Sequence, residues 1–143
     1  MQQWNGGIAS LVLLSALEST ILLSGCSTEP QTENVEYIVD VDSVQCPATA
    51  TVNEPVTINL YGTIGTSGCY SFSRFETRKQ SMQLDLTVWG IFNRTGPPYP
   101  YCPTVMVYLG GMPFTFQPPE RGNFTIVIHN HDGTVLRDSL QVN

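Results

Sequence analysis

Two histidines near the C-terminus have the clearest metal-binding chemistry in the chain. His129 and His131 lie two positions apart, and Asp132 follows them directly. Residues two apart on a strand point to the same face, so these groups are placed to contact one metal ion. Two histidines and one carboxylate form a weak ligand set, however, and they fit the solvated tip of a hairpin better. We therefore predict no metal site and no cofactor.

Nucleophile and phosphate-binding motifs are the next chemistry to consider. The run Gly65-Thr66-Ser67-Gly68 begins like a nucleophile elbow, but Cys69 stands where the last glycine of that motif belongs. The chain has no phosphate-binding loop or dinucleotide fingerprint. The spacing of its acidic residues pairs no two of them for acid–base catalysis. We predict that the protein is not an enzyme.

Basic residues are few and scattered, with six Lys and Arg against twelve Asp and Glu. Only Arg78 and Lys79 are adjacent. Proteins that bind nucleic acid neutralise phosphates with clustered lysine and arginine. The charge pattern therefore predicts that the protein does not bind nucleic acid.

Residues 1–25 have the features of a secretory leader. Two short apolar runs, 8–17 and 21–23, each fall below the roughly 20 residues that span a bilayer. The sequence Leu23-Ser24-Gly25-Cys26 then resembles the lipobox of bacterial lipoproteins. The resemblance implies that residues 1–25 are removed and that Cys26 is lipidated. The alternative is a buried apolar helix that ends in an ordinary cysteine.

Residues 26–34 are polar and contain a proline, so we expect them to form the lipidated cysteine and a flexible tether. Lipoproteins of this kind carry two or three acyl chains, which implies firm membrane attachment. The resemblance places the protein in the bacterial cell envelope. Ser27, where an aspartate would signal inner-membrane retention, favours the outer membrane if the cell is Gram-negative.

From Val35 onward, apolar residues recur with a period of two, which is the signature of strands. The alternating or aromatic segments are 35–42, 56–61, 69–76, 82–89, 105–109, 124–128 and 136–142. Segment 82–89 is the clearest, and it places Trp89 on its polar face. Asp132-Gly133 between two such runs predicts a tight hairpin.

About seven strands in residues 35–143 predict one all-β domain, an immunoglobulin-like antiparallel β-sandwich. A small barrel is the alternative. The segment Gly68-Cys69-Tyr70, with a later cysteine before paired strands, also resembles uncharacterised secreted bacterial domains. That resemblance implies no particular activity.

Lipidation of Cys26 leaves three thiols in an oxidising compartment. Cys69 and Cys102 each lie where a strand gives way to a loop, so we predict a disulfide between them. Spacing alone does not fix connectivity, and pairing of Cys46 with Cys69 or with Cys102 remains open.

Two proline-rich segments, 95–103 and 111–119, carry aromatic residues that we expect in loops. Rigid aromatic rings in exposed loops bind partners at low entropic cost. The possible binding residues are Tyr99, Tyr101, Phe114 and Phe116. The alternative is that these rings cover the end of the core, as large aromatic side chains usually do.

These observations predict a lipid-anchored envelope protein whose β-sandwich binds a partner or has a structural role. Its expected partners are the membrane, through the lipid, and an envelope protein. An inhibitor or accessory module of an envelope enzyme is the first alternative. An uncharacterised envelope enzyme is the second.

Overall fold

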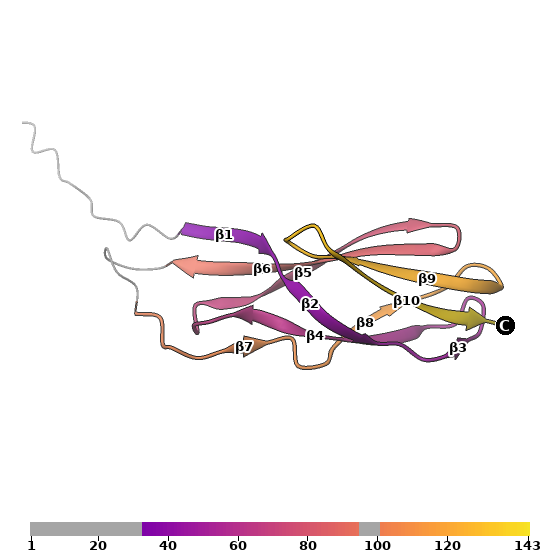
Figure 1. The fold of residues 1–143 in the computed structure, drawn as a ribbon, viewed down its shortest axis with the longest axis horizontal. Coiled ribbons are helices and arrows are strands. Elements are labelled where there is room, and N and C mark those ends of the chain that lie inside the picture. The colour runs from indigo at the N-terminus through magenta and orange to yellow at the C-terminus, as the bar shows by residue number, and fades with distance from the viewer. Residues whose placement is uncertain (1–32, 95–100) are drawn as a thin grey trace, which may run out of the picture.

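The computed structural model describes residues 33–94 and 101–143, which form ten strands and, within those ranges, no helix (Figure 1). The strands are β1 (Glu33–Ile38), β2 (Asp40–Gln45), β3 (Thr49–Ala50), β4 (Val56–Gly65), β5 (Tyr70–Gln80), β6 (Gln83–Arg94), β7 (Val107–Tyr108), β8 (Met112–Phe116), β9 (Gly122–His129) and β10 (Val135–Val142). The predicted all-β sandwich is confirmed. In this part of the chain, no helix is long and apolar enough to cross a membrane.

The strands form two sheets that face each other. In the six-stranded sheet, β6 pairs along its length with β5, and its other edge is shared by β1 and β9. β10 and then β3 continue this sheet beyond β9. In the four-stranded sheet, β4 lies between β2 on one side and β7 and β8 on the other. The β6–β9 and β10–β3 pairs are parallel, so the six-stranded sheet is mixed rather than purely antiparallel.

The strand count exceeds the prediction for three reasons. The alternating run 35–42 is split, because β1 pairs with β6 whereas β2 pairs with β4 in the other sheet. The backbone N–H of Val39, between them, still donates to the carbonyl of Val88. The two-residue β3 and the proline-containing β8 are the other additions. β1 also begins at Glu33, two residues before the predicted start of the domain.

The core lies between the two sheets and is filled by the inward side chains of the alternating strands. Its largest fully buried members are Phe124, Ile58, Leu60, Leu86, Ile126, Ile128, Leu140, Val39, Val88 and Val142. In β6, Leu84, Leu86 and Val88 are buried, while the residues between them face outward. The predicted alternation of this strand, with Trp89 on the outer face, is therefore confirmed.

The predicted hairpin at Asp132-Gly133 joins β9 to β10, and Gly133 adopts a positive φ of 81°. Glycine tolerates this backbone conformation because it has no Cβ. The hairpin is fastened to β2, because the backbone N–H of Val41 donates to Oδ1 of Asn130 at 3.0 Å. The two sheets are thus connected at the hairpin by hydrogen bonds as well as by core packing.

Candidate functional site

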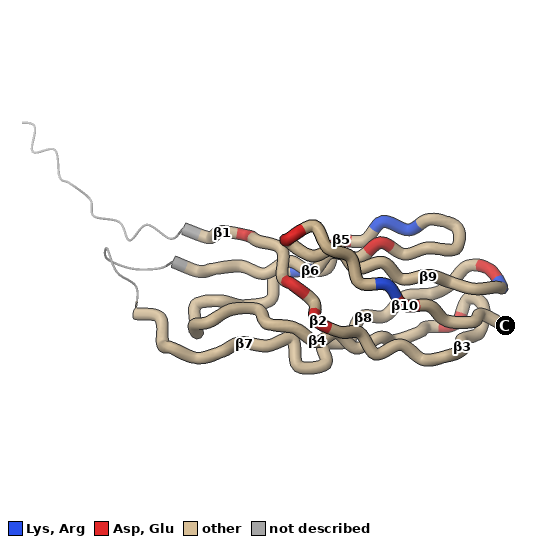
Figure 2. The backbone as a smooth tube through the Cα atoms, in the orientation of Figure 1, with Lys and Arg blue, Asp and Glu red and all other residues tan. Residues whose placement is uncertain are grey.

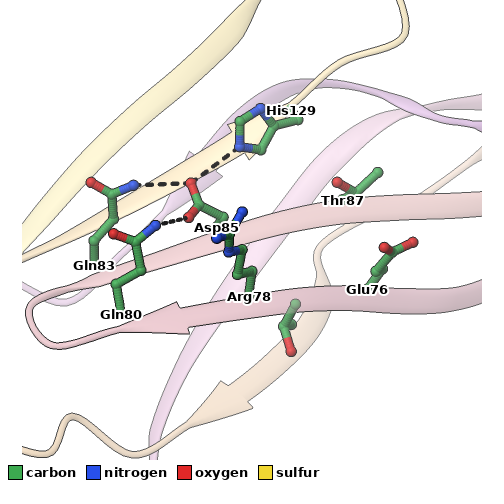
Figure 3. A pocket seen from close by; sticks show the side chains of 8 residues that line it. Glu76, Arg78, Gln80, Gln83, Asp85, Thr87 and His129 are labelled. Atoms are coloured by element: carbon green, nitrogen blue, oxygen red, sulfur yellow. Dashed lines mark hydrogen bonds and ion pairs between the residues drawn. The ribbon is translucent and has the colours of Figure 1, made fainter.

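A hollow of about 370 Å³ lies on the outer face of the six-stranded sheet, over β5, β6 and β9 (Figure 3). Its lining consists almost entirely of side chains that form hydrogen bonds. They are Glu76, Thr77, Arg78, Gln80, Gln83, Asp85, Thr87 and His129. The outward positions of β6 supply the floor, because the alternate positions of that strand point into the core.

The strand register brings residues from three segments together. Pairing of β5 with β6 places Arg78 opposite Asp85 and Glu76 opposite Thr87. Parallel pairing of β6 with β9 places Thr87 opposite His129. Side chains directly opposite or diagonal to each other on neighbouring strands are within contact range. The hollow is therefore a grid of cross-strand neighbours on a regular sheet.

Asp85 is the centre of the hydrogen-bond network in the hollow (Figure 3). Its Oδ1 lies 3.1 Å from Nε2 of His129 and accepts from Nε2 of Gln83 at 2.9 Å. Nε2 of Gln80 donates to Oδ2 at 3.3 Å. The hydrogen bond from the His129 side chain is the main cause that lowers the pKa of Asp85, and the Gln83 hydrogen bond and the charges of His129 and Arg78 add to it. The carboxylate is thus ionised at neutral pH.

One end of the hollow is stiffened by an ion-pair and aromatic cluster. Nε1 of Trp89 donates to Oε2 of Glu76 at 2.7 Å. The guanidinium of Arg74 stacks over the Trp89 ring, 4.7 Å from its centroid, and also pairs with Glu36. Oγ of Ser73 donates to the same Glu36 carboxylate. Glu76 is therefore held in place by its neighbours.

The arrangement suits non-covalent binding of a polar molecule. The lining contains carboxylate acceptors, a guanidinium donor and two amides that both donate and accept. Thr77 and Thr87 supply the hydroxyl groups among these eight residues. Asp85, ionised and hydrogen-bonded, is a poor general acid at neutral pH. The hollow therefore presents an array of hydrogen-bond donors and acceptors.

The structure separates the predicted aromatic residues. Tyr101 is 91% exposed, whereas Phe116 is only 8% exposed. Phe114 and Phe116 belong to β8 and pack in a series of rings with Phe75 and Phe124 across the core. Phe116 is buried and Phe114 is partly buried because their strand turns these rings toward the core, so both fit the alternative that the rings cover the core. Tyr99 lies outside the described residues.

The predicted disulfide between Cys69 and Cys102 is confirmed, with a Cα–Cα distance of 5.3 Å. The backbone N–H of Gly68 donates to the carbonyl of Pro103 beside it. Cys46 remains a half-buried free thiol, which excludes both alternative pairings. Burial, followed by the nearby Asp138 carboxylate, raises the pKa of Cys46 to about 11. This thiol is therefore protonated and unreactive at neutral pH.

The residues weighed as metal ligands do not come together. His129 contacts Asp85, whereas the backbone N–H of His131 donates to Oδ1 of Asp40 at 2.7 Å. Asp132 accepts from both the N–H and the hydroxyl of Thr134. Within residues 33–94 and 101–143, no group of three or more His, Cys, Asp or Glu side chains could hold a metal ion.

Comparison of the chain with protein families, with curated proteins and with solved structures found no match. The site is therefore interpreted from its own geometry. Sequence reasoning identified the polar face of β6 but missed the hollow. The only signal available was that the outward positions of segment 82–89 include Gln83, Asp85 and Thr87.

Proposed function

We propose that the protein is a lipid-anchored binding protein of the bacterial envelope, and that its hollow binds a saccharide chain without catalysis. The observation that carries the proposal is the hydrogen-bonding grid around Asp85 on the outer face of the six-stranded sheet. A regular sheet holds such groups in fixed positions, which lowers the entropy lost when a ligand binds.

The chemistry of the lining favours a hydroxyl-rich ligand over a strongly charged one. Each sugar hydroxyl both donates and accepts, as do the amides of Gln80 and Gln83. Arg78 lies opposite Asp85, so the positive and negative groups at the centre compensate. An anionic ligand would meet the carboxylates of Asp85 and Glu76. A neutral polyol satisfies the same groups without charge repulsion.

The envelope location is supported by the lipobox-like Leu23-Ser24-Gly25-Cys26 and by the Cys69–Cys102 disulfide. Disulfides persist in oxidising compartments and are rare in a reducing cytoplasm. Within a bacterial envelope, cell-wall glycan is an abundant saccharide polymer. It is therefore the first probe for the hollow.

Co-sedimentation with purified peptidoglycan tests the binding site. We expect wild-type protein to pellet with it, and the double variant Gln83→Ala with Asp85→Ala to bind about tenfold more weakly, because it loses two hydrogen-bonding groups. Ser139→Ala, on β10 of the same sheet but outside the lining, is the matched control and should bind normally. Equal binding by wild type and the double variant, or no wild-type binding, would overturn the proposed ligand site.

Lipidation is tested separately with Cys26→Ala and radiolabelled palmitate. We expect label and detergent-phase partitioning in the wild type and neither in the variant, because Cys26 is the proposed acyl acceptor. Cys46→Ala retains Cys26 and is the control. Equal labelling of wild type and Cys26→Ala would refute the anchor.

A further inference from the structure

Residues 101–108 form an exposed, uncharged segment at the disulfide end of the sandwich. Tyr108 is 59% exposed, Val105 49% and Met106 45%, in addition to the nearly fully exposed Tyr101. Exposed apolar side chains that occur singly are ordinary on protein surfaces, but several in one short segment indicate an interaction surface. We refer to these four residues as the apolar end.

The backbone that carries the apolar end is held in place. The disulfide fixes Cys102 beside Cys69, and the carbonyl of Pro103 accepts from the N–H of Gly68. The segment then enters β7, where Tyr108 pairs with Thr63 of β4. The disulfide and these backbone contacts thus hold in place the segment that exposes the side chains of the apolar end.

On the side of the four-stranded sheet the strands near the apolar end are uncharged, whereas β1 at the same end carries Glu36, which pairs with Arg74. β4, β7 and β8 contain no lysine, arginine, aspartate or glutamate (Figure 2). The segment 66–69, which leads to the disulfide, likewise has none. A partner that buries this surface would not have to dehydrate a charged side chain there. A low-dielectric partner therefore fits the surface.

The chain enters the sandwich at this same end (Figure 1). Val35 of β1 pairs with Phe92, and the N–H of Asn93 donates to the carbonyl of Cys69. Only six residues separate Cys26 from Glu33. Seven Cα–Cα steps span at most about 25 Å. A lipid on Cys26 therefore keeps Glu33, the first residue of β1 at this end, within about 25 Å of the bilayer.

We propose that the apolar end rests in the headgroup region of the membrane as a second contact beside the lipid anchor. This inference depends on the anchor proposed above. Tyrosine rings suit the interface because the ring is apolar and the hydroxyl remains hydrated. Val105 and Met106 contribute apolar area between the two tyrosines. The occupant of this surface is the lipid bilayer, rather than a protein or a second copy of the chain.

This contact leaves the hollow at a distance from the membrane. Asp85 lies seven residues from Phe92 along β6, which is about 23 Å at the usual rise of a strand. The hollow, on the outer face of the six-stranded sheet, is thus displaced along the sandwich from the end that contacts lipid.

Depth-dependent fluorescence quenching tests the contact. Mature lipidated protein is reconstituted into vesicles of phosphatidylethanolamine and phosphatidylglycerol that contain brominated acyl chains. Tyr101→Trp should show a blue-shifted added emission and at least about twofold stronger quenching than Ser81→Trp in the β5–β6 turn at the far end. Trp89 is common to both variants, so the difference reports the added ring.

A second variant separates docking from simple proximity. Adding Val105→Asp and Met106→Asp to Tyr101→Trp should reduce its quenching to the level of Ser81→Trp, because charged side chains resist entry into the interface. All four positions are exposed, and an unchanged melting temperature confirms that each variant folds.

Three results would overturn the membrane contact. Equal quenching at positions 101 and 81, or no effect of the two aspartates, would exclude docking while leaving the anchor intact. Concentration-dependent dimerisation that Met106→Asp abolishes would assign the surface to a second copy. If the wild type is not lipidated and does not float with the vesicles, the proposed anchor itself fails.

Discussion

The two ends of the sandwich are stabilised by different interactions. At the disulfide end, a covalent bond and a cluster of packed rings close the structure, with Tyr70 in contact with both Tyr37 and Phe92. At the other end, the hollow is held by hydrogen bonds around Asp85. Burial and cross-linking stabilise strongly and independently of pH near neutrality. Surface hydrogen bonds stabilise weakly but leave polar groups accessible to a ligand.

Removal of the disulfide tests the disulfide end of the sandwich, and it should have the largest effect on the free energy of unfolding. In the chain-entropy model, a bond between residues 33 apart contributes roughly 3.7 kcal/mol. Cys69→Ala with Cys102→Ala should lower the free energy of unfolding by about that amount, as measured by denaturant titration. The stability difference between wild type and variant should disappear in reductant. A difference that persists in reductant would show that alanine packing, rather than the cross-link, is responsible.

Tyr37 tests the packed rings at the same end. Its hydroxyl donates to the carbonyl of Ile64 at 2.6 Å, and Gly90 permits its ring to lie directly on β6. Tyr37→Phe should destabilise the fold by about 1 kcal/mol at neutral pH because the Ile64 carbonyl loses its partner. Tyr61→Phe, on the outer face of β4, is the control and should have a smaller effect.

The decrease in the free energy of unfolding at alkaline pH provides a second test of Tyr37. Burial, and then the neighbouring Tyr70, raises the pKa of Tyr37 to about 12 from an ordinary value of 10.0. The unfolded chain therefore loses this proton first, so the stability from Tyr37 is complete below pH 10 and is lost as pH rises toward 12. Denaturation titrations should show a shallower alkaline decline in Tyr37→Phe than in wild type. Identical declines would contradict the assignment.

Asp85 tests the hollow end and should give the smallest effect. Its pKa is lowered in the folded state, so its contribution is present above the unfolded value of about 4 and is lost as pH falls below it. Asp85→Asn should cost roughly half a kcal/mol at pH 7, because the groups are partly solvated. The free energy of unfolding should also fall less steeply with decreasing pH in Asp85→Asn than in wild type. Asp42→Asn on β2 is the exposed control, and an effect equal to that of Asp85→Asn would remove the special role of Asp85.

The sequence predicted the strands whose two faces differ in polarity, and it predicted the disulfide. β6 was readable because every second residue from Leu84 to Val88 is buried. β8 was missed because Pro113 within it, and Pro118 and Pro119 after it, suggested a loop. Pro113 is tolerated because β8 lies at the edge of its sheet, where a missing N–H leaves no neighbouring strand unpaired.

The hollow was not predictable because it depends on a non-local register. Asp85 and His129 are 44 residues apart, and they meet only because β9 lies parallel to β6. Alternation shows which residues face outward but not which strands are neighbours. The same limit explains the division of segment 35–42, since a continuous alternating run does not show that the chain changes sheets at Val39.

The pairing of β1 with β6 has a mechanical consequence under the N-terminal lipid anchor proposed above. All six residues of β1 pair antiparallel with β6, starting at the end where the chain enters the sandwich. A pulling force on the chain before Glu33, opposed by a load on the six-stranded sheet, acts along the strands. The interstrand hydrogen bonds of β1 are then sheared together rather than opened one after another. β1 is thus suited to bear tension between the proposed membrane anchor and a ligand bound to the six-stranded sheet.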